Sequence, residues 1–119
     1  MKSSLQKLLS IISLVIASIS LSACSEPEAT APAVVSQGEQ IWSKTCAVCH
    51  SQGLGGSPPI GNVKMWAPRI AQGLPVLYEH AKNGYSGNTG EMPARGGNPA
   101  LTDKEIELAV EYMVSQSKG

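Results

Sequence analysis

The sequence predicts an all-α domain of three to four helices, in which long loops rich in glycine and proline separate the helices. Apolar residues recur at helical spacing in three segments of the chain, and two of these segments carry recognisable capping signals. The loops are expected at 51–63 and 85–99, where glycine and proline interrupt any periodic pattern. No stretch alternates apolar and polar residues as a half-buried strand does, so we expect no sheet.

The first helix is expected to begin at Ser36. Ser36 followed by Glu39 matches a capping box, in which the side chain of each residue satisfies a backbone N–H of the other. The helix would continue through Ile41 and Trp42 toward Cys46. This helix would therefore lead directly to the first of two closely spaced cysteines.

Two further helices are expected in the second half of the chain. The segment 74–83 places four apolar residues on one helical face, and Gly84 then supplies a stop. These four residues are Leu74, Leu77, Tyr78 and Ala81. Thr102 caps the last helix with Glu105 at its third position, and Asp103 adds negative charge at the positive end of the helix dipole. The buried face of this helix is formed by Ile106, Ala109, Val110 and Met113.

The N-terminus is typical of an exported lipoprotein. Two lysines and no acidic residue precede an apolar run at 8–21, which is shorter than the ~20 residues of a spanning helix. Leu21-Ser22-Ala23-Cys24 resembles the lipobox of bacterial lipoproteins, and cleavage would leave Cys24 as a lipid-bearing N-terminus. The exported protein is therefore expected in the bacterial periplasm, and Ser25 after the cysteine slightly favours the outer membrane as its anchor. The alternative is an ordinary signal peptide with a cysteine nearby by chance.

Three segments are therefore expected, namely a signal peptide at 1–23, a lipidated cysteine with a linker at 24–35, and a folded domain at 36–119. The linker is rich in proline and alanine, and its extended reach is on the order of 30 Å. Without Lys2 and Lys7, the exported chain holds seven Lys and Arg against nine Asp and Glu, a slightly acidic balance. This balance excludes a basic nucleic-acid-binding surface.

The chemistry of the chain is expected at Cys46-Ala47-Val48-Cys49-His50. This Cys-x-x-Cys-His pattern is the attachment signature of c-type haem, in which two thiols add to the vinyl groups of the porphyrin and the histidine binds the iron. A redox-active cysteine pair would be expected beside strands, which are not predicted. A zinc site needs four ligands, and His80 is the only other candidate. Haem also suits a chain with no phenylalanine, because it supplies apolar interior to a thin core.

The sixth iron ligand is expected from a methionine. Met92 lies in Gly90-Glu91-Met92-Pro93, where glycine lets the loop approach a flat cofactor and proline stiffens it. Met65 is a second candidate, and Met113 lies on the core face of the last helix, where methionine usually packs. An open sixth position also remains possible on these grounds.

From Gly38 to Gln116 the chain resembles a small class I cytochrome c, and most closely the cytochrome c5 group. The resemblance rests on Gly38 with Ile41-Trp42, Cys-Ala-Val-Cys-His, Gly56-Ser57-Pro58-Pro59-Ile60-Gly61, Trp66-Ala67-Pro68-Arg69-Ile70, Gly90-Glu91-Met92-Pro93 with Gly96-Gly97, and Tyr112-Met113-Val114. It implies a class I cytochrome c fold around one covalently bound haem, with His50 and Met92 as axial ligands.

The resemblance carries two further expectations, and the chain departs from the family pattern in two respects. The first and last helices should cross, with Gly38 allowing close approach near Tyr112. The carbonyl of Pro58 should accept the Nδ1 proton of His50 and orient the ring. Some relatives have an additional disulfide, for which this chain lacks the cysteines, and the lipobox is not typical of the soluble members.

Some other residues have two possible roles. Arg69 and Trp66 are candidates to meet the haem propionates, by charge and by the indole N–H, or else to make ordinary surface and core contacts. Tyr85 would back the Met92 loop or simply pack. His80 is expected to face solvent on its helix.

The sequence thus predicts an electron carrier and not an enzyme. The haem would pass single electrons between redox partner proteins that dock weakly at its edge, and the lipid on Cys24 would hold the domain at a membrane. One alternative is a fixed haem relay within a larger redox complex. Another is a haem protein with an open sixth position that binds a small ligand or processes peroxide, but no distal histidine stands out for it.

Overall fold

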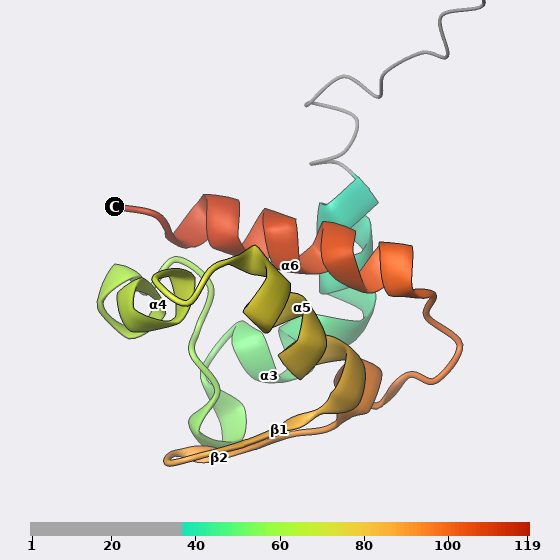
Figure 1. Ribbon diagram of the computed structural model, residues 1–119, viewed down its shortest axis with the longest axis horizontal. Helices are drawn as coiled ribbons and strands as arrows, with labels where there is room; N and C mark the ends of the chain where they lie inside the picture. Colours follow the sequence, from blue (N-terminus) through green and yellow to red (C-terminus); the bar gives the residue numbers. More distant parts are fainter. Residues whose placement is uncertain (1–36) are drawn as a thin grey trace, which may run out of the picture.

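The computed structural model describes residues 37–119, which form helices and one short hairpin (Figure 1). The predictions made for the signal peptide, the lipid on Cys24, the linker and the Ser36 cap lie outside the described residues. The elements are η1 (Trp42–Cys46), α3 (Ala47–His50), η2 (Leu54–Gly56), α4 (Val63–Ile70), α5 (Leu74–Asn83), β1 (Tyr85–Gly87), β2 (Gly90–Met92), η3 (Ala94–Gly97) and α6 (Asp103–Ser117).

The first helix is continuous from residue 37 to residue 50 but changes its winding on the way. Residues 37–41 are α-helical, η1 is a π-helical segment, and α3 resumes the α-helix. The N–H of Ala47 donates to the carbonyl of Trp42, five residues back, as a π turn requires. The expected helix toward Cys46 is present, and its π turn is a feature that the residue pattern did not predict.

The first helix crosses α6 at Gly38. A Cβ at this position would collide with the carbonyl oxygen of Leu108 and would lie 2.8 Å from Cβ of Tyr112. No other residue fits there without moving α6. The close approach implied by the class I resemblance is therefore present, and the rings of Trp42 and Tyr112 pack beside it with centroids 5.6 Å apart.

α5 begins and ends where the sequence predicts, and α6 begins at the predicted cap. α5 spans Leu74–Asn83, and Gly84 follows it with φ 85. At the start of α6 the side chain of Thr102 accepts from the N–H of Glu105, and the carboxylate of Glu105 accepts from the N–H of Thr102. The predicted capping box is confirmed.

One helix and one hairpin, besides the short turns η2 and η3, lie in segments that were predicted as loops or not assigned. α4 begins where the side chain of Asn62 accepts from the N–H of Met65 at 3.0 Å. β1 and β2 pair antiparallel, with Tyr85 opposite Met92, inside the loop predicted at 85–99. The expectation of no sheet is wrong at this hairpin, since three-residue strands are too short to show alternation. The mainly helical class is correct.

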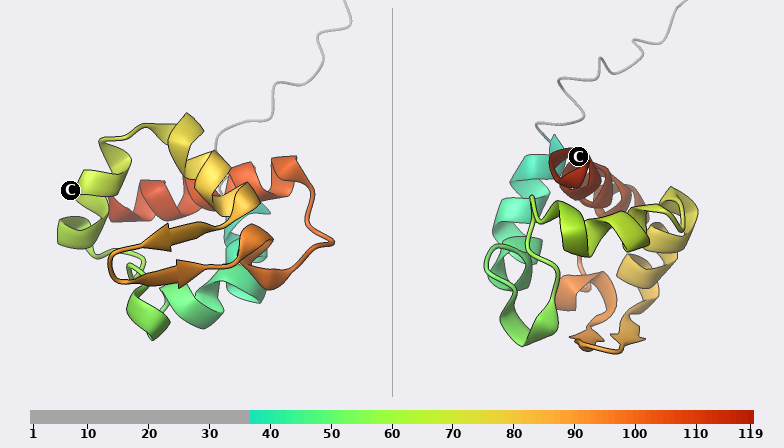
Figure 2. Two further views of the ribbon diagram at one scale, coloured as in Figure 1. Left: turned by 60° about the horizontal axis from the view of Figure 1, so that its bottom comes forward. Right: turned by 90° about the vertical axis from the view of Figure 1, so that its left-hand side faces the viewer.

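The core lies between α4, α5 and α6. Its buried members are Trp66, Leu77, Ala81, Ile106, Val110, Met113 and Val114. In the right-hand view of Figure 2, the first helix (cyan), α6 (red), α5 (yellow) and the hairpin (orange) surround a common centre. Within residues 37–119, none of the helices has both the length and the apolar character needed to cross a membrane.

Candidate haem site

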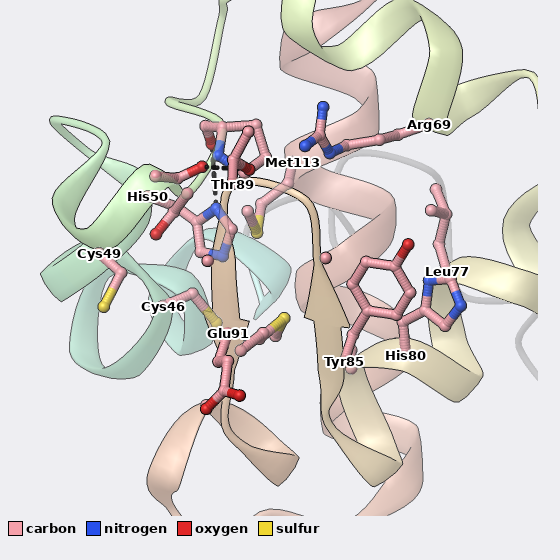
Figure 3. Close-up of a pocket in the computed structure, with 18 of the residues that line it drawn as sticks. Cys46, Cys49, His50, Arg69, Leu77, His80, Tyr85, Thr89, Glu91 and Met113 are labelled. Carbon is pink, nitrogen blue, oxygen red and sulfur yellow. Dashed lines mark hydrogen bonds between the residues drawn. The ribbon is translucent and has the colours of Figure 1, made fainter.

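One cavity of about 400 Å³ opens among α3, α4, α5, α6 and the hairpin. This volume lies in the range of roughly 300–1,000 Å³ typical of cofactor sites. Most of the candidate site residues from the sequence line it: Cys46, Cys49, His50, Pro58, Trp66, Arg69, His80, Tyr85, Met92 and Met113. Figure 3 shows His50, Cys46 and Cys49 at one side of the cavity and Tyr85, His80 and Leu77 at the other.

The helical winding of the Cys-x-x-Cys-His segment brings its three functional side chains to this cavity. Cys46 ends η1, and Cys49 and His50 form the last turn of α3. The two cysteines form no disulfide and are half-buried, and His50 is buried. A helical turn thus presents two thiols and one imidazole to the same space, which is the donor set that covalent haem attachment needs.

The His50 ring is fixed by the loop that follows it. Nδ1 of His50 lies 3.0 Å from the carbonyl oxygen of Pro58, so the Nδ1 proton is donated there and Nε2 stays free. The loop itself is attached by the N–H of Ile60, which donates to the carbonyl of His50 at 2.7 Å. The ring orientation expected from the Pro58 carbonyl is present. Such a hydrogen bond raises the basicity of a metal-binding imidazole.

Burial sets the protonation of these groups. Burial lowers the pKa of His50, the Pro58 hydrogen bond partly opposes this shift, and the charge of Arg69 lowers the pKa further. Burial also raises the pKa of the Cys46 thiol to about 11, with a smaller contribution from Cys49. His50 is therefore a neutral imidazole at neutral pH, the form that binds a metal.

Of the three candidate methionines, Met92 reaches the cavity from an element that is not otherwise core. It ends β2, where it is half-buried and faces Tyr85 across the hairpin. Met113 also lines the cavity but is buried in the packed face of α6, 5 % exposed. Met65 is half-buried on α4 and is not among the lining residues of the cavity.

Arg69 and Trp66 differ in how their polar atoms are used. Nε1 of Trp66 donates to the carbonyl of Pro59 at 2.8 Å, and its ring is buried. Trp66 is therefore a core residue, and its indole N–H is not available to a propionate. Arg69 lines the cavity and is half-buried, with Nη1 donating to the carbonyl of Met65 at 2.5 Å. Arg69 thus places a positive charge at the cavity wall.

The structure corrects the expectation for His80. Instead of facing solvent, it is half-buried, lines the cavity and stacks on Tyr85 with ring centroids 4.0 Å apart. The sequence held a signal for this position, since His80 follows Leu77 by three residues and precedes Gly84 by four, on one helical stripe. Tyr85, expected to back the Met92 loop or simply pack, lies opposite Met92 on the neighbouring strand and is 47 % exposed.

The described residues offer no competing metal site. No three His, Cys, Asp or Glu side chains gather as a metal-binding group within residues 37–119. The residues that line the cavity fit a haem instead, because thiols, a neutral imidazole and a thioether converge on a partly open, mainly apolar space.

Comparison with known proteins shows the family to which the chain belongs. The sequence family described as cytochrome c oxidase, cbb3-type, subunit III, matches residues 33–113. Cytochrome c-555 of Chlorobaculum thiosulfatiphilum is 47 % identical over 81 residues, which cover 68 % of this chain and 94 % of the relative. The chain is a class I c-type cytochrome. It carries one covalently bound haem c, and it is an electron carrier and not an enzyme.

Another relative and two solved structures that resemble this chain are also described as cytochromes c. Cytochrome c-555 of Chlorobaculum tepidum is 48 % identical over 68 % of this chain and 75 % of its own length. A chain in the solved structure of an electron transfer complex of nitrite reductase with cytochrome c is 33 % identical to this chain, with a TM-score of 0.62. The match covers 95 % of that chain and 69 % of this one. A mono-haem ferrocytochrome c from Shewanella putrefaciens is 37 % identical with a TM-score of 0.56, over 68 % of this chain and 94 % of that one.

Proposed function

We propose that this cytochrome transfers single electrons through a haem held by Cys46 and Cys49, with His50 and Met92 as the axial ligands of its iron. The observation that carries the proposal is the convergence of the His50 imidazole and the half-buried Met92 thioether on a single cavity that Cys46 and Cys49 also line. The bound haem supplies a one-electron iron couple. Within class I, we keep the cytochrome c5 group as the expected assignment.

The residues of the chain do no acid–base work in this proposal. The Pro58 carbonyl orients His50, and burial keeps the imidazole neutral so that it is ready to bind iron. The apolar cavity wall excludes water, and sulfur ligation together with low polarity favours the reduced iron and raises the potential. Arg69 is proposed to balance the negative propionates from the cavity wall.

Attachment to a membrane is proposed through the lipid expected on Cys24. The tether would hold the domain in the periplasm near its partners and raise their effective concentration. The structure of the nitrite reductase complex, in which a related cytochrome c is bound to its partner, supports redox proteins as partners here. We propose weak docking over a small interface near the cavity mouth, because a shuttle has to leave quickly.

The optical spectrum of the oxidised protein tests the axial ligands. A methionine–iron pair gives a weak near-infrared charge-transfer band, and we expect this band in the native protein and its loss in Met92→Ala. That variant should keep its covalent haem, have a lower potential and bind carbon monoxide. Met65→Leu is the matched control, because Met65 is half-buried but lies outside the cavity lining, and it should keep the band.

Two outcomes would overturn the ligand proposal. A native protein without the band at neutral pH has no methionine ligand, and the reading as a ligand-binding haem protein would then replace this one. Loss of the band in Met65→Leu with its retention in Met92→Ala would transfer the ligand role to Met65.

A fixed haem relay in a larger complex is the second candidate function. It is supported by the matching sequence family, whose description is a subunit of cbb3-type cytochrome c oxidase. Purification from membranes in mild detergent separates the two functions. A shuttle elutes as a monomer, whereas a relay subunit co-purifies with its complex in constant ratio.

A further inference from the structure

Arg95 has a backbone conformation that its side chain does not favour. Its φ is 54° and its ψ is 28°, and within residues 37–119 it is the one residue other than glycine with a positive φ. The left-handed region is costly for a residue with a Cβ, and it persists where the surrounding structure enforces it. Strained residues of this kind gather at functional sites, where neighbouring contacts hold them in place.

The guanidinium of Arg95 holds the conformation by bridging to the start of α6. Nη1 donates to the carbonyl of Leu101 at 2.6 Å, and Nη2 donates to the carboxylate of Asp103 at 2.5 Å. Hydrogen bonds from a charged donor are stronger than neutral ones. The Asp103 side chain is 60 % exposed, so its part of the bridge is weakened by solvent, and the partly buried bond to Leu101 is the firmer one.

Arg95 belongs to the turn that directly follows Met92. In this turn the N–H of Gly96 donates to the carbonyl of Pro93, and the N–H of Asn98 donates to the carbonyl of Arg95, both at 3.1 Å. The other side of the Met92 segment is packed against the end of α5. A Cβ at Gly84 would lie 3.0 Å from the carbonyl oxygen of Met92, so the backbones are in close contact there. The guanidinium bridge therefore ties the turn after Met92 to the start of α6.

We propose that Arg95 is a positioning residue for Met92. Its guanidinium fixes the turn η3 to the start of α6, and the fixed turn holds the Met92 sulfur toward the cavity. This inference rests on the proposed function, in which Met92 is the sixth ligand. It assigns to Arg95 the task of keeping the methionine from leaving the iron.

The rate of cyanide binding to the oxidised protein measures this task, because cyanide enters when the methionine segment opens. We expect Arg95→Ala and Arg95→Gly to bind cyanide about three- to tenfold faster than the native protein, as the loss of a charge-assisted anchor raises the open population. Arg95→Lys is the milder variant, since it keeps the charge but not the two-pronged geometry. Lys82→Gln is the matched control. Lys82 pairs with Asp103 and Glu107 in the same cluster of charges, and its side chain bonds to α6 rather than to the turn, so the rate in Lys82→Gln should stay native.

Glycine separates the side chain from the backbone, because it adopts a positive φ without cost. If the conformation alone held the segment, Arg95→Gly would bind cyanide at the native rate and only Arg95→Ala would be faster, which would overturn the proposal. Native rates in all three Arg95 variants would overturn it as well.

Hydrogen exchange gives a readout that does not depend on the iron ligand. The Gly96 and Asn98 amides should exchange about three- to tenfold faster in Arg95→Ala than in the native protein, and unchanged exchange would refute the anchor. Met92→Ala in the same series keeps the two proposals apart. If it retains the near-infrared band, the ligand assignment fails, while the exchange rates still report whether Arg95 fixes the turn.

Discussion

Replacing Gly38 by alanine should destabilise the protein, although alanine is the better helix former. The added Cβ would collide with the carbonyl oxygen of Leu108 and lie 2.8 Å from Cβ of Tyr112. The Leu108 oxygen belongs to the backbone of α6 and cannot rotate away, so the two helices have to separate. Overpacking of this kind costs about 1–3 kcal/mol, and the gain in helix propensity offsets up to about 1 kcal/mol of it.

The net loss of about 1–2 kcal/mol corresponds to a fall in Tm of about 5–15 °C for a domain of this size. Thermal unfolding of the haem-loaded protein, followed by circular dichroism, measures it. Gln40→Ala is the control, since Gln40 is exposed on the same helix and its replacement should leave Tm within a few degrees. A Tm for Gly38→Ala equal to or above the native value would refute the argument that this crossing has no room for a methyl group.

Four further substitutions test the capping box, the Trp66 bond and the hairpin. Thr102→Ala should cost about 1 kcal/mol in a denaturant titration, as loss of an N-cap does. The hydrogen bond from the Thr102 N–H holds the pKa of Glu105 below its ordinary value of 4.5. The stability that this bond adds is therefore complete above pH 4.5 and is lost as the pH falls through the lower pKa of the folded protein. Glu105→Gln should make the unfolding free energy less dependent on pH in the acid range. An unaltered pH dependence would contradict the lowered pKa of Glu105. Trp66→Phe removes the donor to the Pro59 carbonyl and should lower the unfolding free energy by about 1 kcal/mol, whereas no change would show that water replaces the bond. In Gly90→Ala the new Cβ would collide with the backbone of η2, so we expect a loss of about 1–3 kcal/mol, and native stability would mean that the hairpin tip moves freely.

The helices that could be predicted are those whose ends carry local signals. Thr102 and Glu105 mark the start of α6, and Gly84 marks the end of α5, because caps act over a few residues of adjacent chain. The start of α4 had a similar signal in Asn62, but Pro68 inside the helix hides it from a reading of helix formers. The hairpin has strands of three residues, and its pairing depends on contacts that the chain alone does not display.

The site was predictable where chemistry requires a fixed spacing. Cys46, Cys49 and His50 adjoin one another in sequence, so their convergence follows from one helical turn. His80 was misplaced because a helix that is buried on two sides, against the core and against a cavity, has a wider buried stripe than the core residues alone define. The role of Arg95 was not visible because positive φ is a property of the folded backbone and not of the residue type.

The π turn in the first helix allows this one helix to contact α6 with one face and to line the cavity with another. Each residue advances an α-helix by about 100°, so one extra residue in a turn shifts everything after it by roughly that angle. Before η1 the helix meets α6 through Gly38, and after it the same helix directs Cys49 and His50 to the cavity. The π turn therefore sets the angle between the helix face used before it and the face used after it. Removing a single residue from 43–45 would leave the Gly38 crossing and the Cys-x-x-Cys-His motif intact in sequence, yet it would turn one of them away from its partner surface.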